Sequence, residues 1–400
     1  MGRLKVLNPC GRICRQPGRP GPTPLSQRLA HLLYRRALAG KTHPPKPFVE
    51  RWGALFYEKN DTEQALLGAL WNVSAPGHSH RDANAIYLAG YGEHLLINSG
   101  YNGYGNASEG FPWTYISDTA ESSNTLLVGD QNHLEKGADG LLEGLLTQGI
   151  DYACGLANRA FEGESQHKRS FIFVCPQQDA PGYFLLIDDV ENTSRPISLA
   201  LHPASARVEI KQKDEEYTWN VKSRKDTDTF LTLFLGTKPQ TVEVKEGALA
   251  GWGKCFVGKY LYATYPSAPI ITVIFPHDDA HPKSDIRRTE NGVTLQHAKG
   301  IVDTVTHHSM LRQVRHQHEF YFARQSTYFK DGDIGFASDK PVTLYMHGKT
   351  GHVVSPGTEV SFHHPNVTRV NIDGETFVSE STLEGVRVTV PQGTCRIELG

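Results

Sequence analysis

From about residue 80 to its C-terminus, the chain repeats short runs of β-branched and aromatic residues, and this recurrence is the strongest constraint on its fold. Turn-forming residues separate the runs at intervals typical of all-β proteins, and helical patterns nearly vanish. Asn291-Gly292 and Asp373-Gly374 each lie between two such runs, as expected for two-residue β-hairpin turns. We therefore predict an all-β fold, built mainly as a large antiparallel β-sandwich. The runs include AIYL, RSFIFVC, YFLLIDDV, TFLTLFLG, PIITVIFP and EFYFAR.

Composition shifts divide the chain into three predicted parts. Residues 1–46 form a basic, Pro-rich leader that is poorly structured or helical, and residues 47–330 form the sandwich. After residue 331 the runs shorten and alternate strictly, which predicts a small β domain over 331–400. The run TEQALLGALWNVS fits either an amphipathic helix or a buried strand, and the sequence leaves both open.

The charge distribution limits the kinds of partner. Residues 1–49 hold ten Lys or Arg and no acidic residue, whereas the rest holds 31 basic and 43 acidic residues, a net charge of −12. An acidic body argues against a nucleic-acid function. The sequence also has no apolar run long enough for a membrane helix, and the leader lacks the apolar centre of a secretory signal.

A polar stretch, GHSHRDANAIYL, precedes one of the predicted strands. If it is extended, its two-residue period places His78, His80, Asp82 and Asn84 on one face. A glycine turn then returns the chain, so that Asn98 comes close to this face. Two imidazoles with an oxygen donor from a neighbouring strand suit a metal site or a proton-transfer site. A hydrogen-bonded surface turn is the alternative.

The segment GYNGYGNASEGFPWTYISD gathers aromatic residues among glycines and asparagines without a strand period. Its members include Tyr101, Tyr104, Trp113 and Tyr115. A core strand would show alternation, so this density favours a loop that faces a substrate over core filling. Flat rings of this kind stack on the faces of sugars.

Two charged segments have two interpretations each. His167, Lys168 and Arg169 either contact an anionic sugar or begin an antiparallel strand. The stretch HDDAHPKSD at 277–285 either binds a metal ion or forms a solvated loop, and its proline favours the loop.

Taken in order, these segments resemble the C-terminal β-sandwich of the heparinase II/III-like polysaccharide lyases. The resemblance rests on H-x-H-x-D, a short G-x-G turn, LLIN-x-G with a following tyrosine, and SSNTLLVGDQNH. HKRSFIFV and GYFLLIDDVE resemble the family's next strands. The similarity covers about residues 50 to 330 and implies a sandwich of the supersandwich type.

The resemblance implies an enzyme that cleaves uronic-acid polysaccharides, such as alginate, a glycosaminoglycan or ulvan, by β-elimination. Carried over residue by residue, it makes His78 a catalytic or substrate-contacting histidine and His80 a metal-facing one. Tyr104 matches the family's tyrosine and lines the cleft as a second catalytic candidate. Asn84, Tyr101, Trp113 and Tyr115 are substrate-binding candidates. Periplasmic, cell-envelope or secreted localisation follows from the resemblance alone.

The sequence departs from the family pattern at the metal ligands. Asn98 stands where the family has an aspartate, and Ser123 stands where it has a histidine. An amide and a hydroxyl are poor ligands for Zn²⁺, so no cofactor is firmly predicted. Zinc bound by His80 and Asn98 stays an alternative, with Asp82 or Asp118 as replacement ligands.

The second departure concerns the helical half of such enzymes. The resemblance implies an N-terminal α/α-toroid that supplies further catalytic residues, whereas about 75 residues precede the motif here. We therefore expect either the sandwich portion of a longer lyase or a non-catalytic carbohydrate-binding or assembly module.

Overall fold

The computed structural model describes residues 48–58, 64–73, 80–98, 119–129, 131–134, 137–177, 179–205, 210–221, 228–251, 254–377, 380–381 and 385–400. Within these ranges the chain forms β-strands and two short 3₁₀ helices, η1 (Ala120–Ser122) and η2 (Ala298–Gly300), with no α-helix. All strand pairs are antiparallel, which confirms the predicted all-β class. The described part contains no helix that could cross a membrane.

The strands form four sheets, and two of them build the centre of the molecule. The five-stranded sheet contains, in spatial order, β1 (Phe48–Glu50), β2 (Gly53–Tyr57), β3 (Leu67–Trp71), β4 (Ala85–Gly90) and β5 (Glu93–Leu96). The eight-stranded sheet contains β12 (Ile210–Lys213), β13 (Glu216–Asn220), β14 (Phe230–Leu235), β17 (Ile270–His277), β10 (Tyr183–Glu191), β9 (Gln166–Val174), β8 (Ile150–Leu156) and β7 (Gly140–Leu146).

The other two sheets complete the layers. The four-stranded sheet contains β15 (Thr241–Gly251), β16 (Lys254–Tyr265), β11 (Ile197–Leu201) and β6 (Leu126–Val128). The eleven-stranded sheet contains β18 (Asp285–Thr289), β19 (Gly292–Gln296), β20 (Ile301–Thr306), β21 (Ser309–Val314), β22 (Gln317–Asp331), β23 (Ile334–His347), β24 (Thr350–His363), β28 (Gly385–Leu399), β25 (Val370–Ile372) and β26 (Glu375–Phe377), with β27 (Glu380–Ser381) on β28.

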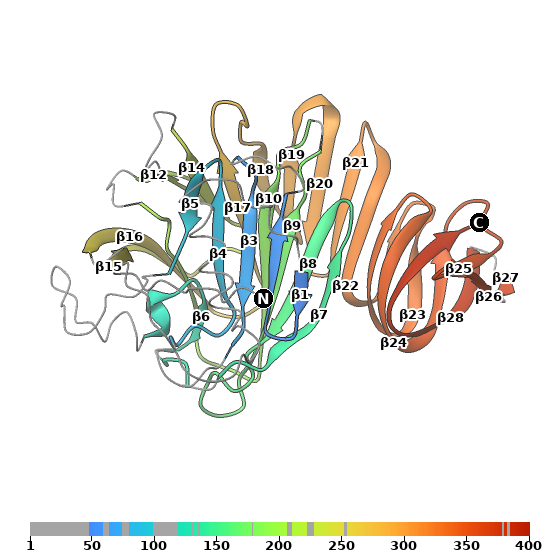
Figure 1. The fold of residues 1–400 in the computed structure, drawn as a ribbon, viewed down its shortest axis with the longest axis horizontal. Helices are drawn as coiled ribbons and strands as arrows, with labels where there is room; N and C mark the ends of the chain where they lie inside the picture. The colour runs from blue at the N-terminus through green and yellow to red at the C-terminus, as the bar shows by residue number, and fades with distance from the viewer. Residues whose placement is uncertain are drawn as a thin grey trace, which may run out of the picture.

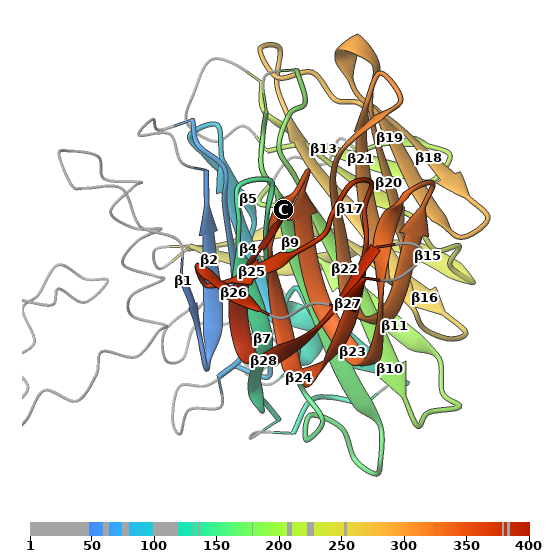
Figure 2. The same ribbon diagram turned by 90° about the vertical axis from the view of Figure 1, so that its right-hand side faces the viewer.

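The eight-stranded sheet is the middle layer, because both of its faces are buried. Along β10, Phe184 and Leu186 join one core cluster, whereas Leu185 and Ile187 join another on the opposite face. The first cluster lies against the five- and four-stranded sheets, and the second lies against the eleven-stranded sheet. Figure 2 shows β1, β2 and β4 on one side of β9 and β18 to β20 on the other. Strands buried on both faces explain the continuous apolar runs in the sequence.

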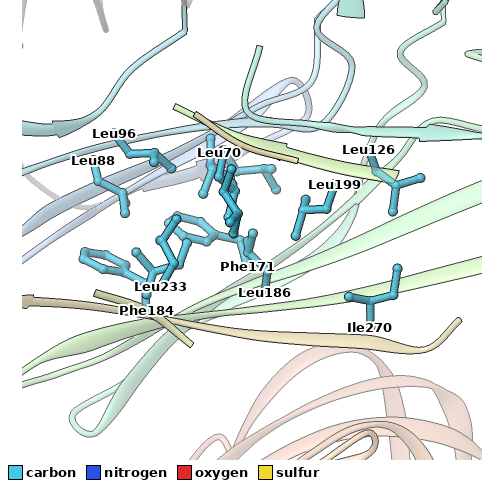
Figure 3. Packing of buried hydrophobic residues seen from close by; sticks show 14 of the residues in the cluster. Leu70, Leu88, Leu96, Leu126, Phe171, Phe184, Leu186, Leu199, Leu233 and Ile270 are labelled. Atoms are coloured by element: carbon cyan, nitrogen blue, oxygen red, sulfur yellow. The ribbon is translucent and has the colours of Figure 1, made fainter. Parts of the chain in front are cut away.

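The first core layer joins three sheets. Figure 3 shows Leu70, Leu88 and Leu96 of the five-stranded sheet facing Phe171, Phe184 and Leu186 of the middle layer, with Leu126 and Leu199 of the four-stranded sheet alongside. Gly68 on β3 lies so close to the middle layer that a Cβ there would come within 2.5 Å of the Phe184 ring. The ambiguous run TEQALLGALWNVS thus contains the strand β3 over Leu67–Trp71, and the small Gly68 permits this approach.

The C-terminal strands curl around a third core at one end of the molecule (Figure 1). This core includes Phe336, Val360 and Val388. The strands β22 and β23 pair across residue 331, so the eleven-stranded sheet is continuous from 285 to 399. The proposed division at 331 thus falls in a hairpin within one sheet, and the third core gathers residues from both sides of it, including Tyr321 and Ala323. The division into two domains at 331 stays a prediction.

Both predicted hairpins form. Asp373 and Gly374 occupy the turn between β25 and β26, with φ angles of 52° and 89° that match a type I′ turn. The other hairpin joins β18 to β19, but its turn lies one residue earlier than expected. Gly292 pairs with Thr289 there, and Asn291 lies within the turn.

Candidate functional site

The H-x-H segment enters the described structure at His80, and residues 80–84 form a turn instead of the expected strand. The strand β4 begins only at Ala85, whose N–H donates to the Asp82 carbonyl at 3.0 Å. Asn84 has a φ of 59°, a left-handed conformation that asparagine adopts more readily than most residues. The predicted alternation of His80, Asp82 and Asn84 on one strand face is therefore wrong.

Asn84 is fully buried, and its amide holds the turn against the middle layer. Its Nδ2 donates to the Gly155 carbonyl at 3.1 Å and lies 3.4 Å from His167 Nδ1, while its Oδ1 accepts from Asn72. A Cβ at Gly155 would come within 2.2 Å of this Oδ1, so only glycine fits. The predicted substrate-binding residue Asn84 thus points into the protein and positions the turn.

The Arg169 side chain fixes the turn through backbone carbonyls. Its Nη1 donates to the carbonyls of Asn84 at 2.9 Å and Asn124 at 2.8 Å. Its Nε and Nη2 bind the two carboxylate oxygens of Asp188 at 2.7 and 3.1 Å. His167 Nε2 lies 2.7 Å from the same carboxylate, and all three side chains are fully buried. The turn therefore rests on a closed ion cluster of His167, Arg169 and Asp188, which we call the Asp188 cluster.

The electrostatics of this cluster follow from burial and mutual attraction. Burial alone would raise the pKa of Asp188, but Arg169 and His167 together hold it below its usual range. Burial lowers the pKa of His167, against the opposing effect of Asp188. A buried charge is tolerated when it is paired and hydrogen-bonded, as it is here.

The cluster decides between the two interpretations of the basic segment. His167 and Arg169 face the first core layer in phase with Phe171 and Phe173, and neither reaches the surface. Only Lys168 points outward, where it pairs with Glu191 at 3.0 Å. The segment is therefore the start of a strand and no contact for a sugar. The shared parity with Phe171 and Phe173 was the signal in the sequence that marked both residues as buried.

The segment SSNT, which lies directly before β6, supports the same turn. The Thr125 hydroxyl donates to the Ala83 carbonyl at 2.6 Å, and Asn124 Nδ2 donates to the Ile86 carbonyl at 3.0 Å. Asn124 Oδ1 accepts from the His202 backbone N–H at 2.6 Å. Ser123 is buried, and its hydroxyl has no partner within the described chain. The Asn and Thr of this segment therefore have structural roles.

Of the two predicted metal-site residues, Asn98 belongs to a hydrogen-bonded cluster with Tyr87 and Asp82, and His80 lies close enough to Asp82 to influence its charge. Asn98 Nδ2 donates to the Tyr87 hydroxyl at 2.7 Å, and that hydroxyl lies 3.4 Å from Asp82 Oδ2. Asp82 is 5% exposed, and burial raises its pKa while nearby His80 lowers it. Half-buried His80 thus lies at the outer side of this cluster.

These donors do not fit a zinc site. Across the described ranges, no three His, Cys, Asp or Glu side chains gather where they could hold a metal ion. Asn98 could offer only its neutral amide oxygen and Ser123 only a neutral hydroxyl, whereas Zn²⁺ prefers imidazole, thiolate and carboxylate ligands.

The remaining site predictions lie outside the described residues. They are His78, Tyr101, Tyr104, Trp113, Tyr115 and the replacement ligand Asp118. The nearest described elements along the chain are the turn at 80–84, which follows His78, and β5 and η1, which lie before and after residues 101–118.

Comparison with known proteins agrees with this architecture. The family model "Heparinase II/III-like, C-terminal" matches residues 50–254. A solved heparan sulfate lyase HepC mutant from Pedobacter heparinus superposes with a TM-score of 0.53 at 13% identity, covering 70% of this chain and 46% of that one. A crystal structure of heparinase III gives a TM-score of 0.51 at 17% identity, covering 69% and 43%. A search of curated protein sequences gives no match.

These comparisons establish fold and family. At such identities the solved structures show a shared fold, and this chain spans less than half the length of each. The family model, in contrast, covers more than half of the chain. The protein belongs to the heparinase II/III-like family, whose C-terminal domain it contains.

Proposed function

We propose that this chain is the sandwich portion of a polysaccharide lyase that cleaves a uronic-acid polymer by β-elimination. The observation that carries the proposal is the family match over residues 50–254, which includes the H-x-H motif and the turn at residues 80–84 held by the Asp188 cluster. A buried support beneath the turn that carries the candidate His80 is what a preorganised site requires.

The reaction sets three demands on the site. The C6 carboxylate of the uronate must be neutralised, a base must remove the C5 proton, and an acid must protonate the departing C4 oxygen. In our proposal His78 contacts the reacting uronate, and Tyr104 is the second proton-transfer candidate. Tyr101, Trp113 and Tyr115 stack on neighbouring sugar rings, and His80 lies at the border of the site.

The proposal includes a partner domain. An α/α-toroid supplies the rest of the catalytic groups in our account, consistent with the 43–46% of the solved heparinase chains that this chain covers. The substrate is an anionic polysaccharide such as a glycosaminoglycan, alginate or ulvan. The corresponding compartment is the periplasm, the cell envelope or the exterior.

The test is to incubate the full chain with heparan sulfate, hyaluronan, alginate and ulvan, and to follow the ultraviolet absorbance of unsaturated uronate. Because the toroid supplies part of the catalytic groups in our proposal, we expect this chain alone to form product slowly on at least one polymer, and we expect His78→Ala to form none. The control is His316→Ala, which changes a histidine in the turn between β21 and β22. The proposal fails if no polymer gives product and His78→Ala binds each polymer as the wild type does.

A second function is supported by the poor fit of the donors to zinc. In this account the sandwich binds an acidic sugar through its aromatic segment and does not cleave it. Binding on a glycan array without product, lost in Trp113→Ala, favours this second function. Turnover of any polymer excludes it.

A further inference from the structure

A groove lies at the end of the middle layer, where the eleven-stranded sheet no longer covers it. Its volume is about 520 Å³, within the range of small-ligand sites. Along β14, Phe234 is buried beneath the eleven-stranded sheet, but Phe230 at the strand's start is only half-buried. Along β17 the same change occurs between Phe275 and His277. The groove therefore opens where the second core layer ends.

The strand register places the lining side chains of β12, β13, β14 and β17 on one face of the eight-stranded sheet. Lys211 pairs with Thr218, and Phe230 pairs with His277. This face is the one opposite to the five- and four-stranded sheets, because Leu231 and Leu233, which alternate with Phe230, belong to the first core layer. The groove is thus separate from the candidate site at residues 80–84. The lining residues are Lys211, Lys213, Glu216, Thr218, Phe230, His277, Asp278, Asp279, Pro282 and Lys283.

The floor of the groove is aromatic and uncharged at neutral pH. The Phe230 and His277 rings stack with centroids 5.3 Å apart and planes at 19°. Burial and the neighbouring Lys283 lower the pKa of His277 to about 4, although Asp278 acts in the opposite direction. A neutral stacked pair offers a flat apolar surface on which a sugar ring packs.

A chain of hydrogen-bonded hydroxyl groups runs from His277 in this floor to Thr218 at the edge of the groove. Thr232 Oγ1 lies 3.0 Å from His277 Nε2 and 2.7 Å from Thr218 Oγ1. Thr218 borders the groove, so the chain ends where a ligand hydroxyl would lie. Hydroxyls that both donate and accept suit the hydroxyl groups of a sugar.

The charges of the groove are partly paired. Lys283 binds Glu216 at 2.6 Å, and Asp278 binds His281 at 2.8 Å. Lys211 and Lys213, both exposed on β12, have no ion-pair partner in the described part of the chain. Their only unpaired counterpart in the lining is the exposed Asp279. The groove therefore offers two free cations beside an aromatic floor.

We propose that this groove is a second, non-catalytic binding site for an acidic saccharide. A sugar ring stacks on Phe230 and His277, its hydroxyl groups meet Thr218, and its carboxylate or sulfate binds Lys211 and Lys213. The ligand class rests on the proposed function, and the site itself rests on the groove. The loop at 277–285, predicted as either a metal site or a solvated loop, forms the wall of this site.

The experiment measures binding by calorimetry in the His78→Ala background, so that no ligand is consumed. The probes are hexasaccharides of heparan sulfate, which carries sulfates, of hyaluronan, which carries only carboxylates, and of neutral chitin. We expect the double variant Lys211→Glu/Lys213→Glu to weaken binding of an acidic hexasaccharide about tenfold. Phe230→Ala weakens it about fivefold, with the same salt dependence as the parent. The neutral hexasaccharide binds weakly throughout.

The control is Lys238→Glu/Lys340→Glu, which makes the same charge change at two exposed lysines outside the groove. We expect its affinity to stay within about twofold of the parent. Equal losses in both double variants, or wild-type binding by Lys211→Glu/Lys213→Glu with an unchanged melting temperature, would overturn the inference. Cleavage assays of the His78-containing protein test the proposed function separately, because the groove variants leave residues 78–115 unaltered.

Discussion

Single residues hold the turn at residues 80–84 against the middle layer. Arg169 spans from the Asp188 carboxylate to the Asn84 carbonyl, so one guanidinium group links the middle layer to the turn. Asn84 fills the space that Gly155 leaves open. Neither role is visible in the sequence, because Arg169 meets Asn84 across 85 positions and Asn84 meets Gly155 across 71. The residue types alone suggested a sugar contact for Asn84 and left a sugar contact or a strand start open for Arg169.

Replacing Asp188 with asparagine should strongly destabilise the protein. The change leaves Arg169 buried without its counter-charge, and breaking such a pair costs about 3–5 kcal/mol of unfolding free energy. Denaturant unfolding measures this loss. The matched control is Glu191→Gln at the end of the same strand, where the exposed pair with Lys168 is worth less than about 1 kcal/mol. Equal stabilities of the two variants would contradict the role of the Asp188 cluster.

Gly155→Ala should displace the Asn84 amide. The added methyl group collides with Asn84 Oδ1, and such overpacking costs about 1–3 kcal/mol. Asn84→Gly removes the collision while it tolerates the φ of 59°. We expect the double variant to be less destabilised than the sum of the two single variants. Additive losses in denaturant unfolding would show that the two positions do not meet.

At the scale of elements, β10 is the strand that ties the three layers together. Its consecutive aspartates point to opposite faces, where Asp188 binds Arg169 and Asp189 binds Arg324 at 2.7 Å. A similar buried pair joins Asp303 to Arg312 at 2.6 Å in the second core layer. The DD dipeptide in YFLLIDDVE is therefore structural on both faces.

These carboxylates make the fold sensitive to acid. Burial would raise the pKa of Asp188, Asp189 and Asp303, but their arginine and histidine partners lower each below its usual range. A carboxyl group whose pKa is lower in the folded state stabilises the fold at pH values above its pKa in the unfolded chain, which is about 4. This stabilisation is lost as the pH falls from that value through the folded-state pKa. Burial also lowers the pKa of His133 and His202 to about 3. Because both histidines take up protons more readily in the unfolded chain, the free energy of unfolding already decreases as the pH falls below about 6.5.

Unfolding free energy should therefore fall from pH 7 to pH 5 and fall more steeply below pH 4. Denaturant titrations at a series of pH values measure this profile. Asp189→Asn removes one of the lowered carboxyl pKa values, so its profile should be less steep below pH 4 than that of the wild type. Constant stability from pH 7 to pH 3.5 would contradict the proposed charge states.

For the whole molecule, the sequence predicted the class and family but not the packing of the sheets. Alternating and continuous apolar runs identify strands because burial selects side chains locally. The three-layer order depends on which strands pair over long distances, such as β14 with β17, and no local pattern encodes that. The sequence left a strand and a hydrogen-bonded turn open for residues 80–84, because the partners that hold the turn, Arg169 and Thr125, come from distant parts of the chain.

The most direct measurement of the account is hydrogen–deuterium exchange of the full chain with and without a heparan sulfate or alginate oligosaccharide. We expect added protection in peptides that cover residues 78–84 and 101–115, because these residues contact the acidic sugar in the proposed function. The peptides over 167–174 and 183–190 belong to the buried middle layer and should exchange slowly in both samples. Saturating ligand that leaves both 78–84 and 101–115 unprotected would contradict the account.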